Sequence, residues 1–424
     1  MICLMPQCGY LSETSRMIEI HRALVARGAE VRMAVHGGTY EWLIRRAAID
    51  YDVVGPHMTP QRSAQLVRDS PGLGDVRQSV YTMSELLTYA RAEAAYFRRH
   101  GVRAVVTGFT LTTLLSSRLA GIPVITEHNG SWLPPVWEAG LLPVPADPAW
   151  PWMRAVPRRA MRRLVNAAPA RVRWYTGPIN AAARTLGVEP IPSMAALTLG
   201  DVALLTELPD VVGVPAEAFS SWRVGNRRGY RAGTRLAVAG PIYARLPMEV
   251  PPEIVSFLDE AGPRVYVAMT SSPIDLVRGV VRRVAATGAR VIVAGTTHEV
   301  GDLAGPRVRV AAVLPSHRVM PRVDLAVTTA GQGSMQTAMA SGTPVIGIPL
   351  QAEQDLNVAV LERLGAARRI SRADALTARL TRMATAMLAD VDVRRRAQGV
   401  KELYDRVDGA AKAAEIIDEV VNSR

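Results

Sequence analysis

Apolar and polar positions along this chain repeat in the order strand, helix, strand. The N-terminal end predicts an apolar strand over Ile2–Met5, a helix over Ser15–Arg27 with apolar residues at helical spacing, and a second strand over Val31–Val35. Gly28 suits the position that follows the last turn of a helix. Units of this kind build a parallel sheet through right-handed crossovers.

The same order recurs in both halves of the chain. Further strands of the first half are predicted at Ala104–Thr107, Pro123–Thr126 and Asp201–Leu205. Strands of the second half are predicted at Val265–Met269, Val291–Ala294, Val308–Val310, Leu325–Thr328 and Val345–Ile348. This alternation predicts the α/β class, with two Rossmann-like doubly wound domains.

A proline-rich stretch near residue 240 lacks this periodicity and has the composition of a linker. We therefore expect an N-terminal domain over residues 1–239, a linker over 240–263 and a C-terminal domain over 264–405. Residues 406–424 predict a final helix, which we expect to pack back on the N-terminal domain.

Length and composition fit two large cores, because the chain has 424 residues and 49% of them are apolar. The sequence lacks an uncharged apolar stretch of about 18 residues and a secretory signal, so we expect a cytoplasmic protein. Cys3 and Cys8 are its only cysteines, and their positions give neither a disulfide framework nor metal-ligand spacing. We expect no metal site.

The net charge of +12 raises the question of a nucleic-acid partner. A protein that reads nucleic acid should show a dense basic face with interleaved aromatic residues, or a known binding module. One segment approaches that pattern: residues 153–165 predict a helix with arginines opposite an apolar face. Packing of that face on its own domain is favoured over contact with an anionic membrane, which remains the alternative. We expect no nucleic-acid partner.

Ligands of open parallel sheets bind beyond the carboxyl ends of the strands, at loops and helix N-termini. After the predicted strand Leu325–Thr328, Gly331 and Gly333 let the backbone approach a ligand, and Ser334 can cap the next helix. The free N–H groups of that helix attract a diphosphate. A tight turn without a ligand is the alternative.

The next loop after a strand carries Glu353, Gln354 and Asn357. A carboxylate accepts hydrogen bonds, whereas an amide both donates and accepts them, so such a pair suits the hydroxyl groups of a sugar.

Together these residues resemble the donor-binding signature of the nucleotide-sugar-dependent glycosyltransferases that include UDP-glucuronosyltransferases and macrolide glycosyltransferases. The matching positions are Thr329, Gly331, Gln332, Gly333, Ser334, Gly342, Thr343, Pro344, Glu353, Gln354 and Asn357. The opening of the chain is also similar to that family, at Gly9–Leu11 and Arg27–Val31.

The resemblance implies the GT-B fold, in which two facing Rossmann-like domains enclose a cleft. It also implies inverting, metal-independent transfer of a sugar from a UDP- or dTDP-sugar, bound by the C-terminal domain, to a small natural-product acceptor, bound by the N-terminal domain. The nucleotide sugar would be a co-substrate, and no cofactor is expected. The oligomeric state is open, with a dimer among the alternatives.

Two departures from the family pattern bear on donor recognition. Thr329 stands where the family has a His that contacts the diphosphate, and Thr337 where it has a Glu that holds the ribose hydroxyls. By resemblance, Ser271 and Ser272 are further phosphate contacts, and Leu314 lies in the base-binding stretch. Helix capping by the serines is the alternative to phosphate binding.

The catalytic base is not set by the resemblance, because Tyr10 stands where the family has its basic His. An unperturbed tyrosine, with a pKa of about 10, is a poor base near neutral pH. Glu13, His36 and His128 follow predicted strands closely and are the candidate substitutes. Ordinary loop or packing roles are the alternatives.

Acceptor contacts are expected beside these candidate bases. The candidates are Tyr10, Glu127, Asn129, Trp132 and Trp137. Aromatic walls are the usual enclosure of ring-shaped ligands. Two other functions stay open: a catalytically degenerate protein that binds a nucleotide or a partner, and a sugar-nucleotide epimerase.

Overall fold

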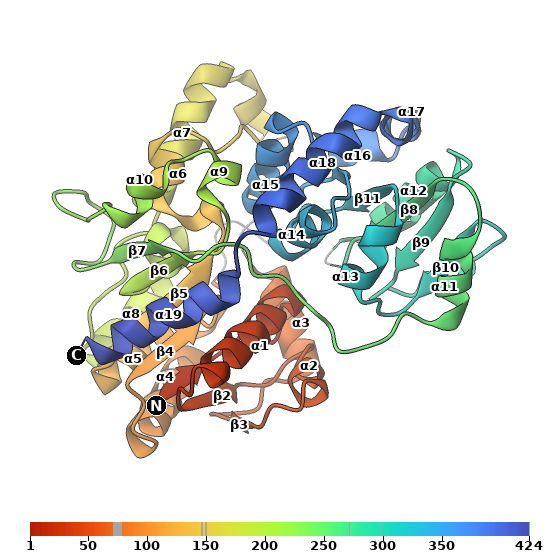
Figure 1. Cartoon of the computed structure of the whole chain (residues 1–424). Coiled ribbons are helices and arrows are strands. Elements are labelled where there is room, and N and C mark those ends of the chain that lie inside the picture. Colours follow the sequence, from red (N-terminus) through yellow and green to blue (C-terminus); the bar gives the residue numbers. More distant parts are fainter. Residues whose placement is uncertain (71–78, 146, 149–150, 271, 297, 424) are drawn as a thin grey trace. The chain divides into compact units, whose positions relative to one another are not determined.

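The computed structural model describes residues 1–70, 79–145, 147–148, 151–270, 272–296 and 298–423. Its contacts divide the chain into two compact units. The N-terminal unit consists of residues 1–142, 157–242 and 408–424, and the C-terminal unit of 143–156 and 243–407. Each unit contains one parallel sheet with helices packed on it (Figure 1).

The sheet of the N-terminal unit has the strand order β3-β2-β1-β4-β5-β6-β7. Its strands are β1 (Ile2–Leu4), β2 (Val31–Val35), β3 (Tyr51–Val53), β4 (Ala104–Thr107), β5 (Val124–His128), β6 (Val202–Leu205) and β7 (Arg235–Val238). Ile2 pairs with both Val31 and Ala104, so β1 lies between β2 and β4. The strand order reverses at this point, where sheets of this kind bind their ligands.

Helices fill the connections between these strands. They are α1 (Leu11–Ala26), α2 (Trp42–Arg46), α3 (Pro60–Arg68), α4 (Met83–Arg99), α5 (Thr113–Ala120), α6 (Pro134–Glu138), α7 (Arg158–Arg171), α8 (Gly177–Leu186), α9 (Pro209–Val212) and α10 (Ala216–Ser220). The last helix, α19 (Gly409–Asn422), packs beside α1 (Figure 1), where Arg27 Nε donates to Asp418 Oδ2 at 2.8 Å. A Cβ at Gly409 would lie 2.3 Å from the carbonyl oxygen of Pro241, so this close approach requires glycine.

The sheet of the C-terminal unit has the order β10-β9-β8-β11-β12-β13. Its strands are β8 (Arg264–Ala268), β9 (Arg290–Ala294), β10 (Val308–Ala311), β11 (Leu325–Thr328), β12 (Val345–Gly347) and β13 (Ala367–Arg369). Its helices are α11 (Pro252–Asp259), α12 (Ile274–Ala285), α13 (Ser316–Val319), α14 (Gln332–Ala340), α15 (Ala352–Arg363), α16 (Arg372–Ala375), α17 (Ala378–Ala389) and α18 (Val391–Tyr404).

The structure differs from the expected boundaries in two places. The stretch 240–263, expected to be a linker, contains α11, whose apolar side chains Ile254, Phe257 and Leu258 are buried. Residues 143–156, expected in the N-terminal domain, group with the C-terminal unit. The first difference arises because proline-rich sequence does not prevent a short segment from forming a helix that buries its apolar side chains.

The basic amphipathic segment is also less regular than expected. Its helix α7 begins at Arg158, and a 3₁₀ helix occupies Pro151–Ala155. Met161 is buried, whereas Leu164 is 49% exposed. Within the described ranges, no helix combines the length and apolar character needed to cross a bilayer.

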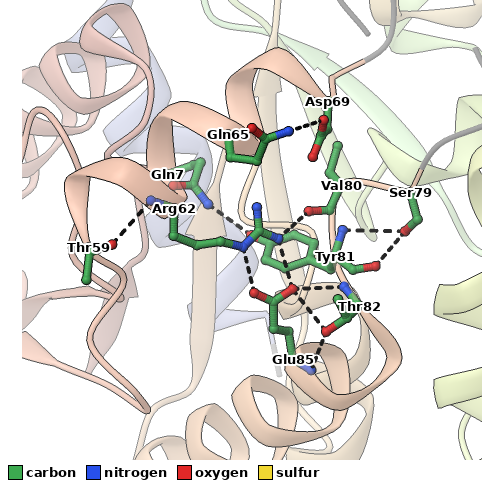
Figure 2. A network of polar contacts seen from close by, with 10 residues as sticks. All are labelled: Gln7, Thr59, Arg62, Gln65, Asp69, Ser79, Val80, Tyr81, Thr82 and Glu85. Carbon is green, nitrogen blue, oxygen red and sulfur yellow. Dashed lines mark hydrogen bonds and ion pairs between the residues drawn. The ribbon is translucent and has the colours of Figure 1, made fainter. Parts of the chain in front are cut away.

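A polar network ties α3 to the start of α4 (Figure 2). The guanidinium of Arg62 donates to both carboxylate oxygens of Glu85, at 2.7 and 2.9 Å, and to the carbonyl of Val80. Gln7 Nε2 donates to the hydroxyl of Tyr81 at 2.9 Å (Figure 2). The loop that follows β1 is thereby fixed against the segment that enters α4.

Candidate functional site

Three buried charged side chains gather at the carboxyl end of the N-terminal sheet. Glu13 and Arg16 belong to the first two turns of α1, and Glu127 belongs to β5. Glu13 and Glu127 are fully buried, and Arg16 is 2% exposed. Buried charges are costly unless they are paired or hydrogen-bonded, so their contacts indicate what they do.

Glu13 is held by the backbone through one oxygen only. Its Oε1 accepts hydrogen bonds from the N–H groups of Gln7 at 3.0 Å, Gly108 at 3.0 Å and Phe109 at 2.8 Å. Its buried Oε2 has no hydrogen-bond partner among the described residues. A buried oxygen without a partner is rare in folded proteins, and a catalytic role is one of its recognised explanations.

Burial raises the pKa of Glu13 to about 7, although the N–H group of Gln7 acts in the opposite direction. Near neutral pH the carboxyl group is therefore present in both protonation states. That value suits a general base, because proton transfer is most efficient when the pKa of the base lies near the working pH.

Glu127 forms an ion pair with Arg16 in the protein interior. Arg16 Nε lies 2.9 Å from Glu127 Oε1 and 2.7 Å from Oε2. The hydroxyl of Thr206 also donates to Oε2, at 3.4 Å. The structure thus places Glu127 in an internal ion pair, in place of the expected contact with the acceptor.

The two histidine candidates are less suited to the role of base. Burial, with the nearby Arg16, lowers the pKa of His128 to about 3, so its imidazole is neutral and weakly basic. His36 is buried, its Nε2 lies 2.9 Å from Glu93 Oε1, and its ring stacks on Tyr89 with centroids 4.1 Å apart. His36 is thus part of a core network, not the expected catalytic group.

Tyr10 packs beside the same site. Its hydroxyl shares a hydrogen bond with Ser70 Oγ, and its ring lies 5.5 Å from that of Phe109. Burial raises the pKa of Tyr10 to about 12, so the phenol is neutral over the working range of most enzymes. An acceptor contact is compatible with its half-buried position.

The remaining acceptor candidates differ in exposure and in their contacts. Trp132 is half-buried, with its ring 5.9 Å from Phe109 and 6.4 Å from His128. Asn129 is buried and caps a 3₁₀ helix by accepting from the N–H group of Ser131 at 3.1 Å. Trp137 is buried, and its Nε1 donates to the hydroxyl of Tyr230. Trp132 is therefore the acceptor wall candidate, while Asn129 and Trp137 have structural contacts.

The glycine loop of the C-terminal unit leads into α14. Gly331 is the N-cap residue, and the residues from Gly331 to Ser334 are half-buried. A Cβ at Gly331 would meet no atom of the described residues within 4 Å, so there is room for a side chain at this position. Ser334 lies inside the helix and does not cap it, contrary to expectation, because the helix already begins at Gln332.

A carboxylate from the first turn of α15 lies at this helix end. Glu353 Oε1 accepts from the N–H group of Gln332 at 3.1 Å and from Asn357 Nδ2 at 2.6 Å. Asn357 Nδ2 also donates to the carbonyl of Ala330 at 2.9 Å. The two segments of the predicted donor signature therefore lie together, with the Glu353 carboxylate on the N-terminus of α14. Glu353, Gln354 and Asn357, expected in a loop, belong to α15, because that helix begins at Ala352.

The other donor candidates are mostly buried. Gln354 Oε1 accepts from the N–H group of Leu350 at 2.7 Å, so its amide supports the loop. Thr329 is 8% exposed, and Thr337 donates to the carbonyl of Gly333, within its own helix. Ser272 and Leu314 are buried. Ser271 lies outside the described residues.

Ala330 has a φ of +60°, a conformation that costs a residue with a Cβ about 1–2 kcal/mol. We expect Ala330→Gly to raise the free energy of unfolding by about 1 kcal/mol, since glycine adopts this conformation without strain. The measurement is urea unfolding. Ala340→Gly, inside α14, should lower it by about 1 kcal/mol. If Ala330→Gly also lowers the free energy of unfolding, the backbone conformation at Ala330 is not strained.

Three residues of the acceptor-side cluster escaped prediction from sequence. Arg16 has helical spacing from Glu13, but its partner Glu127 is 111 positions away. Gly108 and Phe109 directly follow β4, and that position after a strand was the available signal. Among the residues that the structure describes, no group of three His, Cys, Asp or Glu side chains could hold a metal ion.

Comparison with known proteins gives one family match and several relatives. Residues 285–407 match the glycosyltransferase family 28 C-terminal domain. A PGL/p-HBAD biosynthesis glycosyltransferase of Mycobacterium tuberculosis is 26% identical over 319 residues, which cover 74% of this chain and 70% of the relative. The oleandomycin glycosyltransferase of Streptomyces antibioticus is 31% identical over 129 residues, or 30% of each chain.

Solved structures match over the whole length. The glycotransferase of kitacinnamycin has a TM-score of 0.66 and 20% identity, covering 99% of this chain and 98% of that one. The glycosyltransferase VinC, solved in complex with dTDP, has a TM-score of 0.65 and 17% identity, covering 100% of both. The fold predicted from the sequence is thereby confirmed.

Proposed function

We propose that this chain, which is a glycosyltransferase with the GT-B fold, transfers a sugar from a UDP- or dTDP-sugar to a hydroxyl group of a small natural-product acceptor. The C-terminal unit binds the donor, and the N-terminal unit binds the acceptor. The observation that supports this proposal most is the half-buried N-terminus of α14. There the N–H group of Gln332 already binds the carboxylate of Glu353, and Gly331 leaves room for a ligand.

The donor diphosphate binds at the first turn of α14 in this proposal. Backbone N–H groups and the helix dipole attract negative oxygens there, and they can stabilise the departing diphosphate without a metal ion. The carboxylate of Glu353 must leave the N–H group of Gln332 when a diphosphate arrives, because two anions cannot share it. Glu353 is then released to bind the sugar hydroxyls.

Glu13 is the catalytic base in this proposal. The acceptor hydroxyl supplies the hydrogen-bond partner that Glu13 Oε2 does not find among the described residues. Oε2 takes the hydroxyl proton while the acceptor oxygen forms a bond to the anomeric carbon. The bond between that carbon and the diphosphate oxygen breaks, and the nucleoside diphosphate leaves with its electron pair. A single displacement inverts the anomeric configuration.

Gly331→Ala tests the donor site without disturbing the fold. A methyl group there meets open space, so we expect the free energy of unfolding to change by less than about 0.5 kcal/mol. It would project toward the proposed diphosphate, so affinity for dTDP and UDP should fall about 10-fold or more. Gly301→Ala, also in open space, is the matched control and should change neither quantity. Unchanged calorimetric affinity for Gly331→Ala would place the diphosphate elsewhere.

Donor consumption separates transfer from the two alternative functions. A transferase consumes a UDP- or dTDP-sugar only when an acceptor is added. An epimerase converts the donor alone, and a degenerate protein converts nothing. The relatives named above are all glycosyltransferases, which favours transfer.

A further inference from the structure

The charged side chains that act on Glu13 are Arg16 and Glu127. Cys8, Tyr10 and His128 lie in the same part of the N-terminal unit, but none of them is charged near neutral pH. Burial raises the pKa values of Cys8 and Tyr10, that of Tyr10 to about 12, and burial lowers the pKa of His128 to about 3. Among the described residues that act on Glu13, this leaves Arg16 and Glu127, which form an ion pair; burial raises the pKa of Glu127, while Arg16 favours its charged form.

Gly108 brings the two carboxylates together. A Cβ at this position would lie 2.8 Å from Glu13 Cδ and 3.0 Å from Glu127 Oε1, so both carboxylates border the same small space. The N–H group of Gly108 also donates to Glu13. Two buried carboxylates at this range disfavour each other's ionisation, since like charges interact strongly in a medium of low polarity.

Arg16 offsets that repulsion only in part. Its Nε binds both oxygens of Glu127, so its positive charge is directed to Glu127 first. At Glu13 the carboxylate of Glu127 raises the pKa more than the guanidinium of Arg16 lowers it. Glu13 therefore gains a proton at a higher pH than a lone ion pair with Arg16 would allow.

We propose that Arg16 and Glu127 are positioning residues, whose buried ion pair sets, through its charges, the pH at which Glu13 can accept the proton of the acceptor. This inference rests on the proposed role of Glu13. We assign this pair no contact with the acceptor, because Arg16 Nε binds both carboxylate oxygens of Glu127. The pair acts through its charge, so neutralising one partner changes the pH dependence of the reaction.

The test measures the titration of Glu13 without a substrate. The free energy of unfolding is measured as a function of pH for the wild type and for each variant of Glu127 or Arg16. Each value is compared with that of the same protein carrying Glu13→Gln. The difference inflects at the pKa of Glu13 in the folded protein. In the wild type this inflection is expected at about 7. Glu127→Gln removes the repelling charge and should lower it by about one unit or more.

Glu127→Asp is the matched variant, because it keeps the charge; its inflection should stay within about half a unit of the wild-type value. If the inflection in Glu127→Gln stays at the wild-type pH or rises, the proposed coupling is wrong.

A second variant keeps the test decisive should Glu127→Gln fail to fold. The double variant Arg16→Met, Glu127→Gln leaves no unpaired charge in the interior, and such replacements of buried ion pairs are often tolerated. Its inflection should fall below the wild-type value, because Glu127 outweighs Arg16 at Glu13. An inflection at or above the wild-type value overturns the proposal.

The pH profile of kcat/KM connects the titration to the reaction. Its acidic limb should move with the inflection, by the same amount and in the same direction. An inflection that moves while the limb stays fixed means that Glu13 is not the base, and the positioning role then falls. If the wild type transfers no sugar at all, the proposed function fails, whereas the stability titration still decides whether the charges are coupled.

Discussion

Glu13→Gln is expected to lower kcat by about 100- to 10,000-fold, the usual contribution of a general base. The amide oxygen can still accept from the N–H groups of Gln7, Gly108 and Phe109, so the fold should persist. Only the ability to take a proton is lost. The measurement is steady-state transfer from a UDP- or dTDP-sugar. Glu30→Gln, a change of a 79% exposed side chain between the same helix and β2, is the control and should leave kcat unchanged.

The same substitution should stabilise the protein above neutral pH. The pKa of Glu13 rises from 4.5 to about 7 on folding, so the folded state holds a proton that the unfolded chain has lost between these values. Stability from this group is present below pH 4.5 and is lost as the pH rises to about 7. At about pH 8, Glu13→Gln should be more stable than the wild type by up to about 3 kcal/mol. Lower activity with lower stability would indicate a structural role instead.

Glu353→Ala is expected to lower kcat by about 10- to 100-fold, the effect of losing a hydrogen bond to a charged group. Affinity for dTDP or UDP alone should stay equal or increase. The carboxylate now on the N–H group of Gln332 competes with the diphosphate, and its removal frees that group. Calorimetry gives the affinity, and transfer assays give kcat.

Glu402→Ala, an exposed change on α18, is the matched control for Glu353 and should alter neither quantity. Equal losses of nucleotide affinity and kcat in Glu353→Ala would contradict the separation of sugar and diphosphate contacts. Glu353 would then be a structural brace between α14 and α15.

Sequence periodicity predicted the strands that lie inside each sheet. Strands such as β1 and β6 are buried and appear as continuous apolar runs. The edge strands β3, β7 and β13, each partly exposed and with a charged residue, were not predicted. The edge strand β10 shares these features, but its valines on both sides of Arg309 allowed its prediction. Edge strands are covered on fewer sides, so their sequences need not be apolar.

The donor loops were more predictable than the acceptor side. Glycines after a strand and an acid–amide pair after the next strand follow from the chemistry of phosphate and sugar binding. The role of a single residue, in contrast, depends on partners far away in the sequence. Glu127 and His36 are both close to strand ends. In the structure they are buried, Glu127 beside Arg16 and His36 beside Glu93.

The most direct test of the account is a crystal structure with dTDP or UDP bound. The account predicts the diphosphate within hydrogen-bonding distance of the backbone N–H groups at the start of α14, with the carboxylate of Glu353 displaced from Gln332. A diphosphate bound at another place, with the contact between Glu353 and Gln332 intact, would contradict it.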